Sequence, residues 1–518
     1  MNIRNNHIYK LKNEKFDIVV IGGGITGAGI ALTAARKGWK TLIIDKADFA
    51  SGTSSRSAKL IHGGLRYLQQ LQIKLVREAL HEREHLLSEY PHLIKPQPFF
   101  MPIYKSRLNK LKYYIGLSGY DYLSGETSLP KHNSLEIDEV KDKFPQIKTD
   151  DMIGGYIYYD AKTNDARLTN EVIQQATELG AIAINYLTLQ NFITNNNQVT
   201  SIECLDILNN QLINIRSKVF VNATGIWTDE TLRKFNPNDT QQYMAPSKGI
   251  HLIVSNDHLP KDCVLLFPTT NNDGRMLWCI PWEENLNIVG TTDTDYNQSL
   301  DTIWTEKEEI DYILNSLNAQ LKNKQLSYDD ILSVYAGLRP LLNDNDESKK
   351  SNQRSRDYNI WWNNDNLLTI SGGKLTSFLS MAENTILTIT EKHIISSKQN
   401  EEVVLESLID QFKNKYGIKN ASLIAAIIQE NESYLQTITD FNYTIAEVLF
   451  FIRHQHAVRL TDVLTRRTII SYAMQQWNEA LINSIVSIMQ KELHWTEEQV
   501  ANEIEHYKKE WQIMHSWK

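Results

Sequence analysis

The chain has 518 residues, of which 42% are hydrophobic and 22% are charged, and its formal net charge at pH 7 is −8. This composition is typical of a folded globular protein with two or three domains, and the negative charge argues against general nucleic-acid binding, which needs many basic contacts to phosphate. Neither an apolar run of roughly 18 residues nor an apolar stretch near Met1 is present, so the sequence predicts no transmembrane helix and no secretory signal.

Cysteines are few and widely spaced, at Cys204, Cys263 and Cys279. They form neither a CxxC pair nor a disulfide framework, which fits a reducing compartment. We therefore expect a cytoplasmic protein.

The first predicted elements form a strand, a helix and a second strand. Phe16–Ile21 is a short apolar run, typical of a parallel strand that is buried on both faces. It leads directly into the glycine-rich turn Gly22–Gly27, and the small and apolar residues of Ala28–Lys37 predict a helix. Thr41–Ile44 is the second strand, and Asp45 follows it directly.

The glycine spacing in this unit predicts a dinucleotide site. Gly22 permits the tight turn, Gly24 lets the backbone approach a pyrophosphate, and Gly27 lets the helix pack on the strand. The helix N-terminus favours the anion. Asp45 is placed to bind the adenosine ribose, and its charge disfavours the 2′-phosphate of NADP.

Further α/β elements follow at a distance. Leu75–Leu87 predicts an amphipathic helix, Asp165–Gly180 a helix, Ala181–Leu189 a strand, and Lys218–Gly225 a buried strand that ends at a glycine. Leu367–Ile370 predicts another strand, which runs into Ser371-Gly-Gly-Lys374.

The segments 91–160 and 236–335 have a different character, with alternating stretches such as His251–Val254 and Met276–Ile280 that predict antiparallel strands. Asn343–Arg356 reads as a polar, charged loop. From about Glu401 onward, apolar residues at helical spacing predominate, and they predict a separate helical unit.

The chain after Asp45 closely resembles the flavin-dependent glycerol-3-phosphate dehydrogenases. Their Thr-Ser-Ser run is here Thr53–Ser55, and their Lys-Leu-Ile-His-Gly-Gly-Leu-Arg-Tyr stretch is Lys59–Tyr67. Other segments that resemble the family, in the same order, are Ala223–Gly225, Ser247–His251, Gly290–Asp293, Gly337–Pro340, Arg356–Tyr358, Gly372–Thr376 and Arg453–Arg467. The resemblance therefore extends over most of the chain.

This resemblance implies an α/β fold with three domains: a Rossmann-like FAD-binding domain, an α+β substrate domain with an antiparallel sheet, and a C-terminal all-helical domain. We expect residues 1–90, 160–235 and 336–398 to form the discontinuous FAD-binding domain. Residues 91–159 and 236–335 are expected to form the substrate-binding domain, and residues 399–518 the helical domain.

The motifs also indicate which residues bind FAD. The expected cofactor-binding residues are Gly22, Gly24, Gly27, Asp45, Thr53, Ser54, Ser55, Lys59, His62, Gly63, Ala223, Gly225, Gly373, Lys374, Leu375 and Thr376. No metal site is expected among them.

The expected reaction, oxidation of sn-glycerol 3-phosphate to dihydroxyacetone phosphate, sets further requirements. A phosphate dianion in a dry site needs permanently charged donors, for which the candidates are Arg66, Arg339, Arg356 and Lys374, with Tyr67 orienting the substrate. The substrate hydroxyl must lose a proton as its carbon gives up a hydride. The expected catalytic residues are His62, His251, Arg339 and Lys374.

Family resemblance further implies a peripheral membrane enzyme that passes electrons to a quinone. Arg107, Lys110 and Lys112 precede Tyr113–Leu117, a mixture that suits either a membrane interface or an ordinary surface helix. A homodimer is compatible with the helical C-terminal unit.

Four alternative functions remain open. An oxidase that uses oxygen shares the same motifs, although family oxidases usually run longer, and an amine- or amino-acid-oxidising relative would bind a carboxylate instead of a phosphate. His81–His85 matches HExxH, the pattern of a zinc metallopeptidase, but no motif marks a third ligand. A flavin sensor without catalysis would not need the predicted cations.

Overall fold

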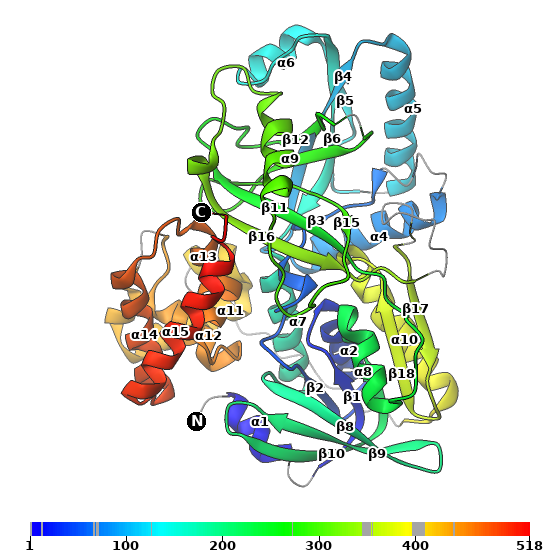
Figure 1. Ribbon diagram of the computed structural model, residues 1–518, viewed down its shortest axis with the longest axis vertical. Helices are drawn as coiled ribbons and strands as arrows, with labels where there is room; N and C mark the ends of the chain where they lie inside the picture. The colour runs from blue at the N-terminus through cyan, green and yellow to red at the C-terminus, as the bar shows by residue number, and fades with distance from the viewer. Residues whose placement is uncertain are drawn as a thin grey trace.

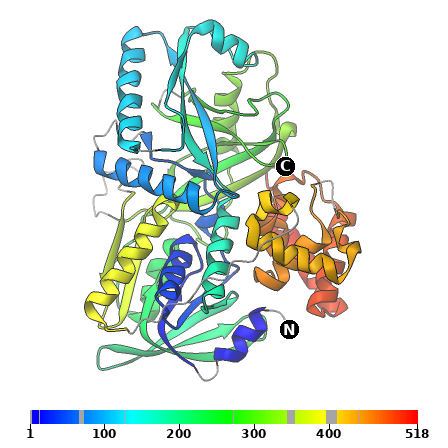
Figure 2. The ribbon, with the colours of Figure 1, turned by 180° about the vertical axis from the view of Figure 1, so that it is seen from behind.

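The computed structural model describes residues 3–11, 14–65, 68, 72–125, 127–271, 273–343, 354, 356–395, 410–438 and 441–517. Figure 1 shows two sheet-containing parts stacked along the long axis of the molecule, with the C-terminal helices packed against one side. Seen from behind, these helices lie across from α4, α5 and α10 (Figure 2).

The first sheet has eight strands, and its central order is β17-β18-β10-β1-β2-β7. Its strands are β1 (Lys15–Ile21), β2 (Thr41–Ile44), β7 (Ile182–Ile184), β8 (Leu187–Asn195), β9 (Gln198–Asp206), β10 (Gln211–Asn222), β17 (Tyr358–Trp362) and β18 (Leu367–Gly372). β1 pairs in parallel with both β2 and β10, and β10 pairs in parallel with β18. The carboxyl ends of these strands therefore meet at one edge of the sheet.

The apolar runs explain this sheet. Several residues of β1 and β2 are completely buried, among them Ile18, Val19, Val20, Leu42 and Ile43. Helices cover one face of the sheet, and β8, β9 and α1 (Ile3–Leu11) lie on the other side (Figure 1). α2 (Ile25–Arg36) packs between α7 (Asp165–Glu178) and α10 (Phe378–Lys392).

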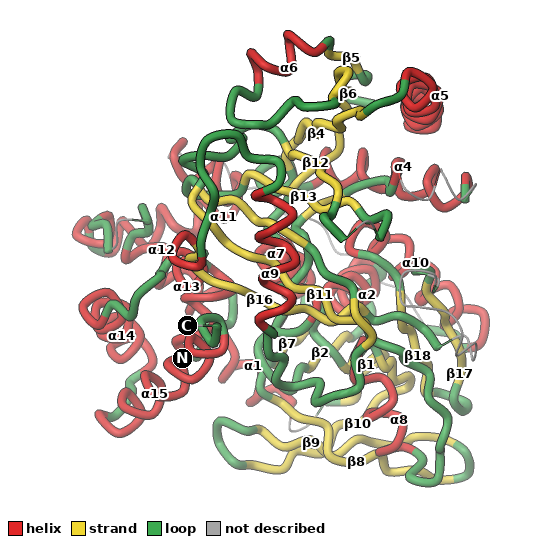
Figure 3. Tube along the Cα trace, turned by 45° about the horizontal axis from the view of Figure 1, so that its top comes forward, coloured by secondary structure: helices red, strands yellow, loops and turns green. Residues whose placement is uncertain are grey.

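The second sheet has ten strands, ordered β15-β11-β14-β13-β12-β4-β6-β3, with β16 paired to β11 and β5 paired to β6. They are β3 (Leu60–Ile61), β4 (Lys95–Tyr104), β5 (Asn133–Leu135), β6 (Met152–Lys162), β11 (Ser247–Ser255), β12 (Val264–Pro268), β13 (Met276–Pro281), β14 (Leu286–Gly290), β15 (Thr294–Asp295) and β16 (Ile331–Arg339). The pairs are antiparallel except for β4 with β12. The tube in Figure 3 follows these strands beside α9 (Lys307–Asn318).

Helices α4 (Ile73–Glu89), α5 (Arg107–Ser124) and α6 (Ile137–Lys143) accompany this sheet, and α8 (Thr228–Phe235) accompanies the first. The C-terminal unit consists of α11 (Asp410–Glu430), α12 (Ile445–His454), α13 (Ile470–Ala473), α14 (Glu479–Leu493) and α15 (Glu497–Ile513), with a π-helical turn over Asp462–Arg467. This unit has its own apolar core, which includes Phe450, Leu460 and Met489. None of the helices in the described ranges is long and apolar enough to cross a bilayer.

One predicted strand is wrong. Instead of a single strand over 181–189, the chain forms β7 and then β8, which pairs with β9 and not with β2. The break lies at Tyr186, whose φ of 55° is in the left-handed region and turns the chain away from the parallel sheet. Most of the predicted loop from Asn343 to Arg356 lies outside the described residues.

Candidate active site

A pocket of about 350 Å³ lies at the carboxyl edge of the first sheet. Its wall begins at the strand ends Ile21, Ile44 and Ile370 and continues into the loops that follow them. β1 is the point where the chain order of the strands reverses, since β2 lies on one side of it and β10 on the other. Such a switch point is the usual ligand position in open α/β sheets.

The sequence anticipated a large part of this wall. The lining residues that it singled out are Gly22, Gly24, Asp45, Thr53, Ser54, Ala223, Gly225, Gly373, Lys374 and Leu375. Residues on the wall that it did not single out are Thr26, Lys46, Ser51, Gly52, Thr188, Trp227, Glu230 and Lys234. Of this second group, Lys46 stacks on Trp227, with Nζ 4.3 Å from the ring centroid.

The glycine-rich turn places the start of α2 at the pocket. Gly24 is the N-cap residue and offers no side chain to the free backbone N–H groups. The N–H of Ile25 donates to Ser54 Oγ at 2.9 Å, so the loop after Asp45 lies over the helix start. Because Gly24, Ile25 and Thr26 line the cavity, the positive end of the helix dipole lies beside it, where it would stabilise a pyrophosphate.

Asp45 is held by backbone donors on two sides. Its Oδ2 accepts from the N–H of Gly23 at 2.6 Å, and its Oδ1 accepts from the N–H of Ala47 at 2.8 Å. Burial raises the pKa of Asp45 to about 6. Each carboxylate oxygen keeps a second lone pair, so the group still has acceptors for a ribose hydroxyl.

Other predicted cofactor residues lie beside the pocket and not on its wall. Lys59 donates to Asp165 Oδ1 at 2.6 Å and to Ser55 O at 2.9 Å, and it is only 2% exposed. Gly27, Gly63 and Thr376 likewise do not line the pocket but belong to segments next to it. The Lys59 and Asp165 ion pair thus fixes the segment after Ser55 against the start of α7.

His62 lies where the two sheets approach each other. Its backbone N–H donates to Thr376 Oγ1 at 3.3 Å, and its ring contacts Trp278 edge to face, with centroids 5.6 Å apart. Burial, together with Lys374 and Arg356, lowers the pKa of His62 to about 3. The imidazole is therefore neutral at physiological pH.

Two predicted cations, Arg339 and Arg356, lie against one buried carboxylate, and a third, Lys374, lies near Arg356. Arg339 Nη1 lies 3.1 Å from Asp293 Oδ1, and Arg356 Nη2 lies 3.7 Å from Asp293 Oδ2. Lys374 has its pKa lowered to about 8 by burial and by Arg356. Burial acts to raise the pKa of Asp293, but Arg339 and Arg356 lower it overall, so the carboxylate stays ionised.

The predicted Gly249 explains how Arg339 fits against β11. A Cβ at this position would lie 2.5 Å from Arg339 Nη2 and 2.6 Å from Thr291 Oγ1, so any larger residue would displace the guanidinium. Arg339 also donates to the carbonyl of Thr292 at 3.0 Å and to Ser247 Oγ at 3.2 Å. The guanidinium is therefore held in a fixed orientation.

His251 is buried, with 4% of its surface exposed, and its ring stacks on Tyr335 with centroids 4.8 Å apart. Neither ring nitrogen has a hydrogen-bond partner within the described part of the chain. Burial and the neighbouring Arg339 and Lys59 lower the pKa of His251 well below its usual value. Buried polar atoms are nearly always paired with protein or water, so the two nitrogens make His251 a candidate contact for a ligand.

Several residues near this centre escaped the sequence analysis. Asp293 was noticed only as part of a motif, and Trp278 and Tyr335 carried no signal because strand order brings them to the site. Arg275, on the same side, donates to the carbonyl of Thr291 at 3.2 Å. The predicted Arg66 and Tyr67 lie outside the described residues.

The HExxH helix has other contacts. Arg83, between its two acidic residues, is buried and donates to Asp160 Oδ1 at 2.6 Å, and Glu84 accepts from Thr127 Oγ1 at 2.6 Å. His85 is largely exposed and lies 3.0 Å from Glu89. Across the described ranges, no group of three or more His, Cys, Asp or Glu side chains is arranged to hold a metal ion.

Comparison with known families assigns nearly the whole chain. The FAD dependent oxidoreductase family matches residues 17–379, and the C-terminal domain of alpha-glycerophosphate oxidase matches residues 368–500. The mitochondrial glycerol-3-phosphate dehydrogenase of Bos taurus is 34% identical over 545 aligned positions, which cover 97% of this chain and 74% of that protein.

Two bacterial proteins are also similar. The aerobic glycerol-3-phosphate dehydrogenase of Staphylococcus epidermidis is 38% identical over 383 positions, covering 73% of this chain and 68% of that protein. The crystal structure of the glycerol-3-phosphate dehydrogenase from Bacillus halodurans, complexed with FAD, superposes with a TM-score of 0.79 at 27% identity, covering 99% of this chain and 98% of that one.

The contact between the helix start and the glycine turn yields a first prediction. In Gly27→Ala, the new Cβ would lie 1.9 Å from the carbonyl oxygen of Gly22, so the turn must shift. We expect the purified variant to lose bound flavin and to be less stable by about 1–3 kcal/mol. Flavin absorbance per protein and thermal unfolding measure the two effects.

Gly116→Ala is the matched control, since this glycine lies within α5 and nothing lies within 4 Å of the added Cβ. We expect it to keep its flavin and to be as stable as the native protein or more so by up to about 1 kcal/mol. Full flavin content in Gly27→Ala would contradict the role given to the turn.

Proposed function

Because the chain belongs to the family of FAD-dependent glycerol-3-phosphate dehydrogenases and oxidases, we propose that it oxidises sn-glycerol 3-phosphate to dihydroxyacetone phosphate and passes the electrons to a membrane quinone. The observation that carries the substrate assignment is the convergence of Arg339, Arg356 and Lys374 beside His62 and His251. FAD, when bound, supplies the two-electron acceptor for the substrate hydride.

The residues of the pocket fit FAD. The start of α2, which has no side-chain cap, suits the pyrophosphate, and Asp45 on the pocket wall suits the ribose. Gly373 and Lys374, also on the wall, precede a short 3-10 turn, Leu375–Ser377, that leads into α10. The positive end of this helix and the Lys374 ammonium favour a negative charge on a reduced ring nearby.

We propose that Arg339, Arg356 and Lys374 bind the phosphate of the substrate, with Arg66 and Tyr67 completing this group. Arg339 can offer a fixed fork of donors because Ser247, Thr292 and Asp293 already hold it in place. An unphosphorylated polyol offers these cations nothing to neutralise. The site should therefore distinguish glycerol 3-phosphate from glycerol.

His251 is the group that we propose accepts the proton of the substrate hydroxyl. Its imidazole is neutral and both ring nitrogens are unpaired among the described residues. A bound phosphate dianion would raise the pKa of this imidazole and bring it closer to the range of an effective base. His62, whose backbone is tied to Thr376, is proposed to orient the reacting carbon.

We also propose the division of the chain expected from the sequence: residues 1–90, 160–235 and 336–398 bind FAD, residues 91–159 and 236–335 bind the substrate, and residues 399–518 form the helical domain. The apolar clusters under the first sheet and within the C-terminal helices support this division, whereas Leu60, Val76 and Leu80 pack in one cluster with residues of the second sheet.

α5 supports attachment to a membrane. Leu108, Leu111, Ile115 and Tyr122 lie on one face of this helix at intervals of three, four and seven residues, and they are 75%, 54%, 63% and 85% exposed. Arg107 and Lys112, both exposed, flank this apolar face. We propose that the face enters the headgroup region of a bilayer, where basic residues meet anionic lipid.

The opposite face of α5 reaches toward the site. Tyr120 OH donates to Asp160 Oδ2 at 2.8 Å, and Asp160 Oδ1 accepts from the N–H of Gly63, next to His62, at 3.4 Å. A quinone dissolved in the bilayer would therefore approach the protein at α5, the helix whose Tyr120 contacts Asp160 next to the His62 segment. The proposed membrane contact of α5 is the support for proposing a quinone as the acceptor.

The central test is anaerobic mixing of the flavin-loaded protein with sn-glycerol 3-phosphate or with glycerol. We expect the first to bleach the flavin absorbance and the second to leave it unchanged.

Arg339→Ala should keep its flavin but lose about 10- to 100-fold in kcat/KM, the usual cost of a lost charged hydrogen bond. His251→Gln should still bind substrate and be reduced more slowly by about 100-fold or more.

Bleaching by glycerol at the same rate would contradict the phosphate requirement. Full activity of Arg339→Ala would show that the cations do not bind substrate. Reoxidation by oxygen that is faster than reoxidation by a water-soluble quinone would favour the oxidase alternative.

Lys374 predicts a pH dependence. Its pKa of about 8 in the free protein means that it loses its charge as the pH rises through this value. Since the substrate phosphate becomes a dianion above about pH 6, kcat/KM should be highest between roughly pH 6 and 8 and should fall above pH 8. Steady-state rates from pH 6 to pH 10 measure this.

Lys374→Arg is the control, because a guanidinium stays protonated throughout this range. We expect the decline near pH 8 to disappear in this variant, whatever its absolute rate. An unchanged decline would assign the titration to another group.

The membrane contact can be tested with the double variant Leu111→Glu/Ile115→Glu. We expect at least about ten-fold weaker binding to anionic phospholipid vesicles, because two apolar side chains no longer enter the bilayer. Anaerobic reduction by glycerol 3-phosphate should be preserved. Co-sedimentation with the vesicles provides the measurement.

Leu387→Glu is the matched control, since Leu387 is 54% exposed on α10 and lies outside the proposed face. It should sediment like the native protein. Equal vesicle binding by the double variant would exclude α5 as the membrane contact.

A further inference from the structure

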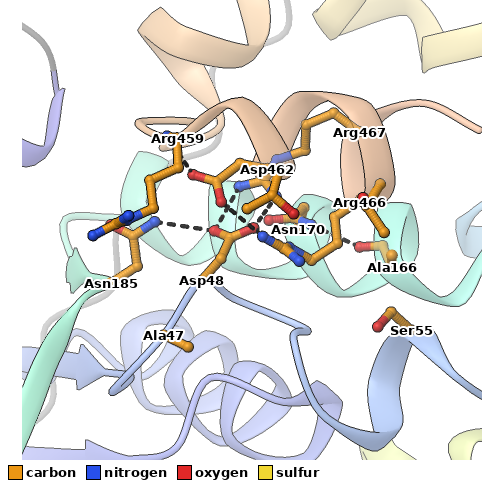
Figure 4. A network of polar contacts seen from close by, with 12 residues as sticks. Ala47, Asp48, Ser55, Ala166, Asn170, Asn185, Arg459, Asp462, Arg466 and Arg467 are labelled. Atoms are coloured by element: carbon orange, nitrogen blue, oxygen red, sulfur yellow. Dashed lines mark hydrogen bonds and ion pairs between the residues drawn. The ribbon is translucent and has the colours of Figure 1, made fainter. Parts of the chain in front are cut away.

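The C-terminal helical unit reaches the FAD-binding part through two buried arginines. Both lie on the π-helical turn Asp462–Arg467. Arg466 Nε donates to Asp48 Oδ2 at 2.5 Å, while Arg467 donates to the same carboxylate through Nη1 at 2.6 Å and Nη2 at 3.1 Å. The side chains of Asp48 and Arg467 are fully buried, and that of Arg466 is 7% exposed. Figure 4 shows the three groups facing one another between the two parts of the chain.

The surrounding groups complete this network. Asp462 Oδ1 accepts from Arg466 Nη2 at 2.7 Å and from Tyr186 OH at 2.6 Å, which balances the second positive charge. Asn185 Nδ2 donates to Asp48 Oδ1 at 3.0 Å (Figure 4). Two arginines and two aspartates thus form a neutral, hydrogen-bonded cluster, the condition under which buried charges are tolerated.

Asp48 is part of the loop that closes the cofactor pocket. This loop, Lys46–Ser55, contributes Lys46, Ser51, Gly52, Thr53 and Ser54 to the pocket wall. The carbonyl of Asp48 accepts from the N–H of Ser51 at 3.2 Å, and the N–H of Ala50 donates to the carbonyl of Gly23 at 3.0 Å. The arginines therefore hold Asp48, which lies just before the pocket-lining residues Ser51–Ser54 of the loop.

The same helical unit is also fixed to the second sheet. Ser333 Oγ donates to the carbonyl of Tyr472 at 2.7 Å, and the N–H of Val334 donates to the carbonyl of Met514 at 3.0 Å. Both contacts are on β16, whose last residue, Arg339, belongs to the substrate site. The unit consequently has a rigid support from which it can hold the loop in place.

We propose that Asp48, Arg466 and Arg467 are positioning residues that keep the cofactor loop closed, so that retention of FAD depends on the C-terminal helical unit although none of the three lines the pocket. This proposal depends on the proposed function, because it takes FAD as the occupant of the pocket. Burial acts to raise the pKa of Asp48, but Arg467 and Arg466 lower it overall, so the contact persists over the physiological pH range.

The test compares purified, flavin-loaded native protein with Arg466→Met and Arg467→Met. Release of FAD is followed by the rise in flavin fluorescence after dilution, at a temperature well below unfolding. We expect FAD release from each variant to be at least about ten-fold faster than from the native protein, because a ten-fold change corresponds to the loss of one modest interaction. Hydrogen–deuterium exchange should rise in Lys46–Ser55 of the loaded protein.

Arg453→Met is the matched control. Arg453 pairs with Glu430 and Glu492, which lie within the same helical unit and do not contact the loop. This variant loses the same kind of charge, and we expect its FAD release and its loop exchange to match those of the native protein. Arg467→Lys keeps the charge and loses the paired donors, so it should release FAD at an intermediate rate. It replaces Arg467→Met in the experiment if that variant does not accumulate as folded protein.

Three outcomes would overturn the proposal. The first is a lower melting temperature in Arg466→Met and Arg467→Met with unchanged FAD release and loop exchange, which would leave the network a purely structural role. The second is equally fast release from Arg453→Met, and the third is native behaviour of all variants. Native protein that binds no FAD at all would instead contradict the proposed function, before any variant is compared.

Discussion

The proposed substrate site depends on holding several partly buried cationic side chains close together. Like charges repel strongly at low dielectric, and each one also loses hydration. Asp293, with a side chain that is 2% exposed, offsets both costs because it lies against Arg339 and Arg356. Asp293 and Asp357 carry two negative charges against the three positive charges of Arg339, Arg356 and Lys374, and a doubly charged phosphate could neutralise the remaining positive charge.

The fold explains why these charges can meet. Asp293 follows β14, Arg339 ends β16, and Lys374 follows β18 of the other sheet, so the site forms only where the two sheets approach each other. Thr53 Oγ1 donates to the carbonyl of Leu338 at 2.7 Å, which joins the cofactor loop directly to the substrate strand. The cofactor pocket and the proposed substrate site therefore meet at one junction between the two sheets.

Local patterns in the sequence were sufficient for the elements that are continuous in the chain. The apolar runs before Gly22 and Asp45 predict β1 and β2 because both strands are buried on both faces, and the glycine spacing predicts the turn between β1 and α2. The resemblance to the flavin-dependent dehydrogenases added the candidate cations. Neither source could show that β10 lies between β1 and β18, since strand order is set by packing and not by local residue pattern.

The contacts that the sequence left hidden are those between distant segments. The edge-to-face contact of His62 with Trp278 and the stacking of His251 on Tyr335 need the strand register before they can be seen. Tyr186 reads as an ordinary strand residue, but its left-handed conformation separates β7 from β8 and brings its hydroxyl to Asp462. In each case a side chain is placed by a tertiary contact that its neighbours in sequence do not encode.

The wide separation of Asp48 and Arg467, 419 positions apart, also bears on how the protein is made. During translation, Asp48 leaves the ribosome long before its partner, and β1 must likewise wait for β10 and β10 for β18. Early in synthesis the N-terminal segment therefore has open strand edges, which chaperones shield in nascent chains. The network around Asp48 and the first sheet can therefore form only late, when most of the chain has been synthesised.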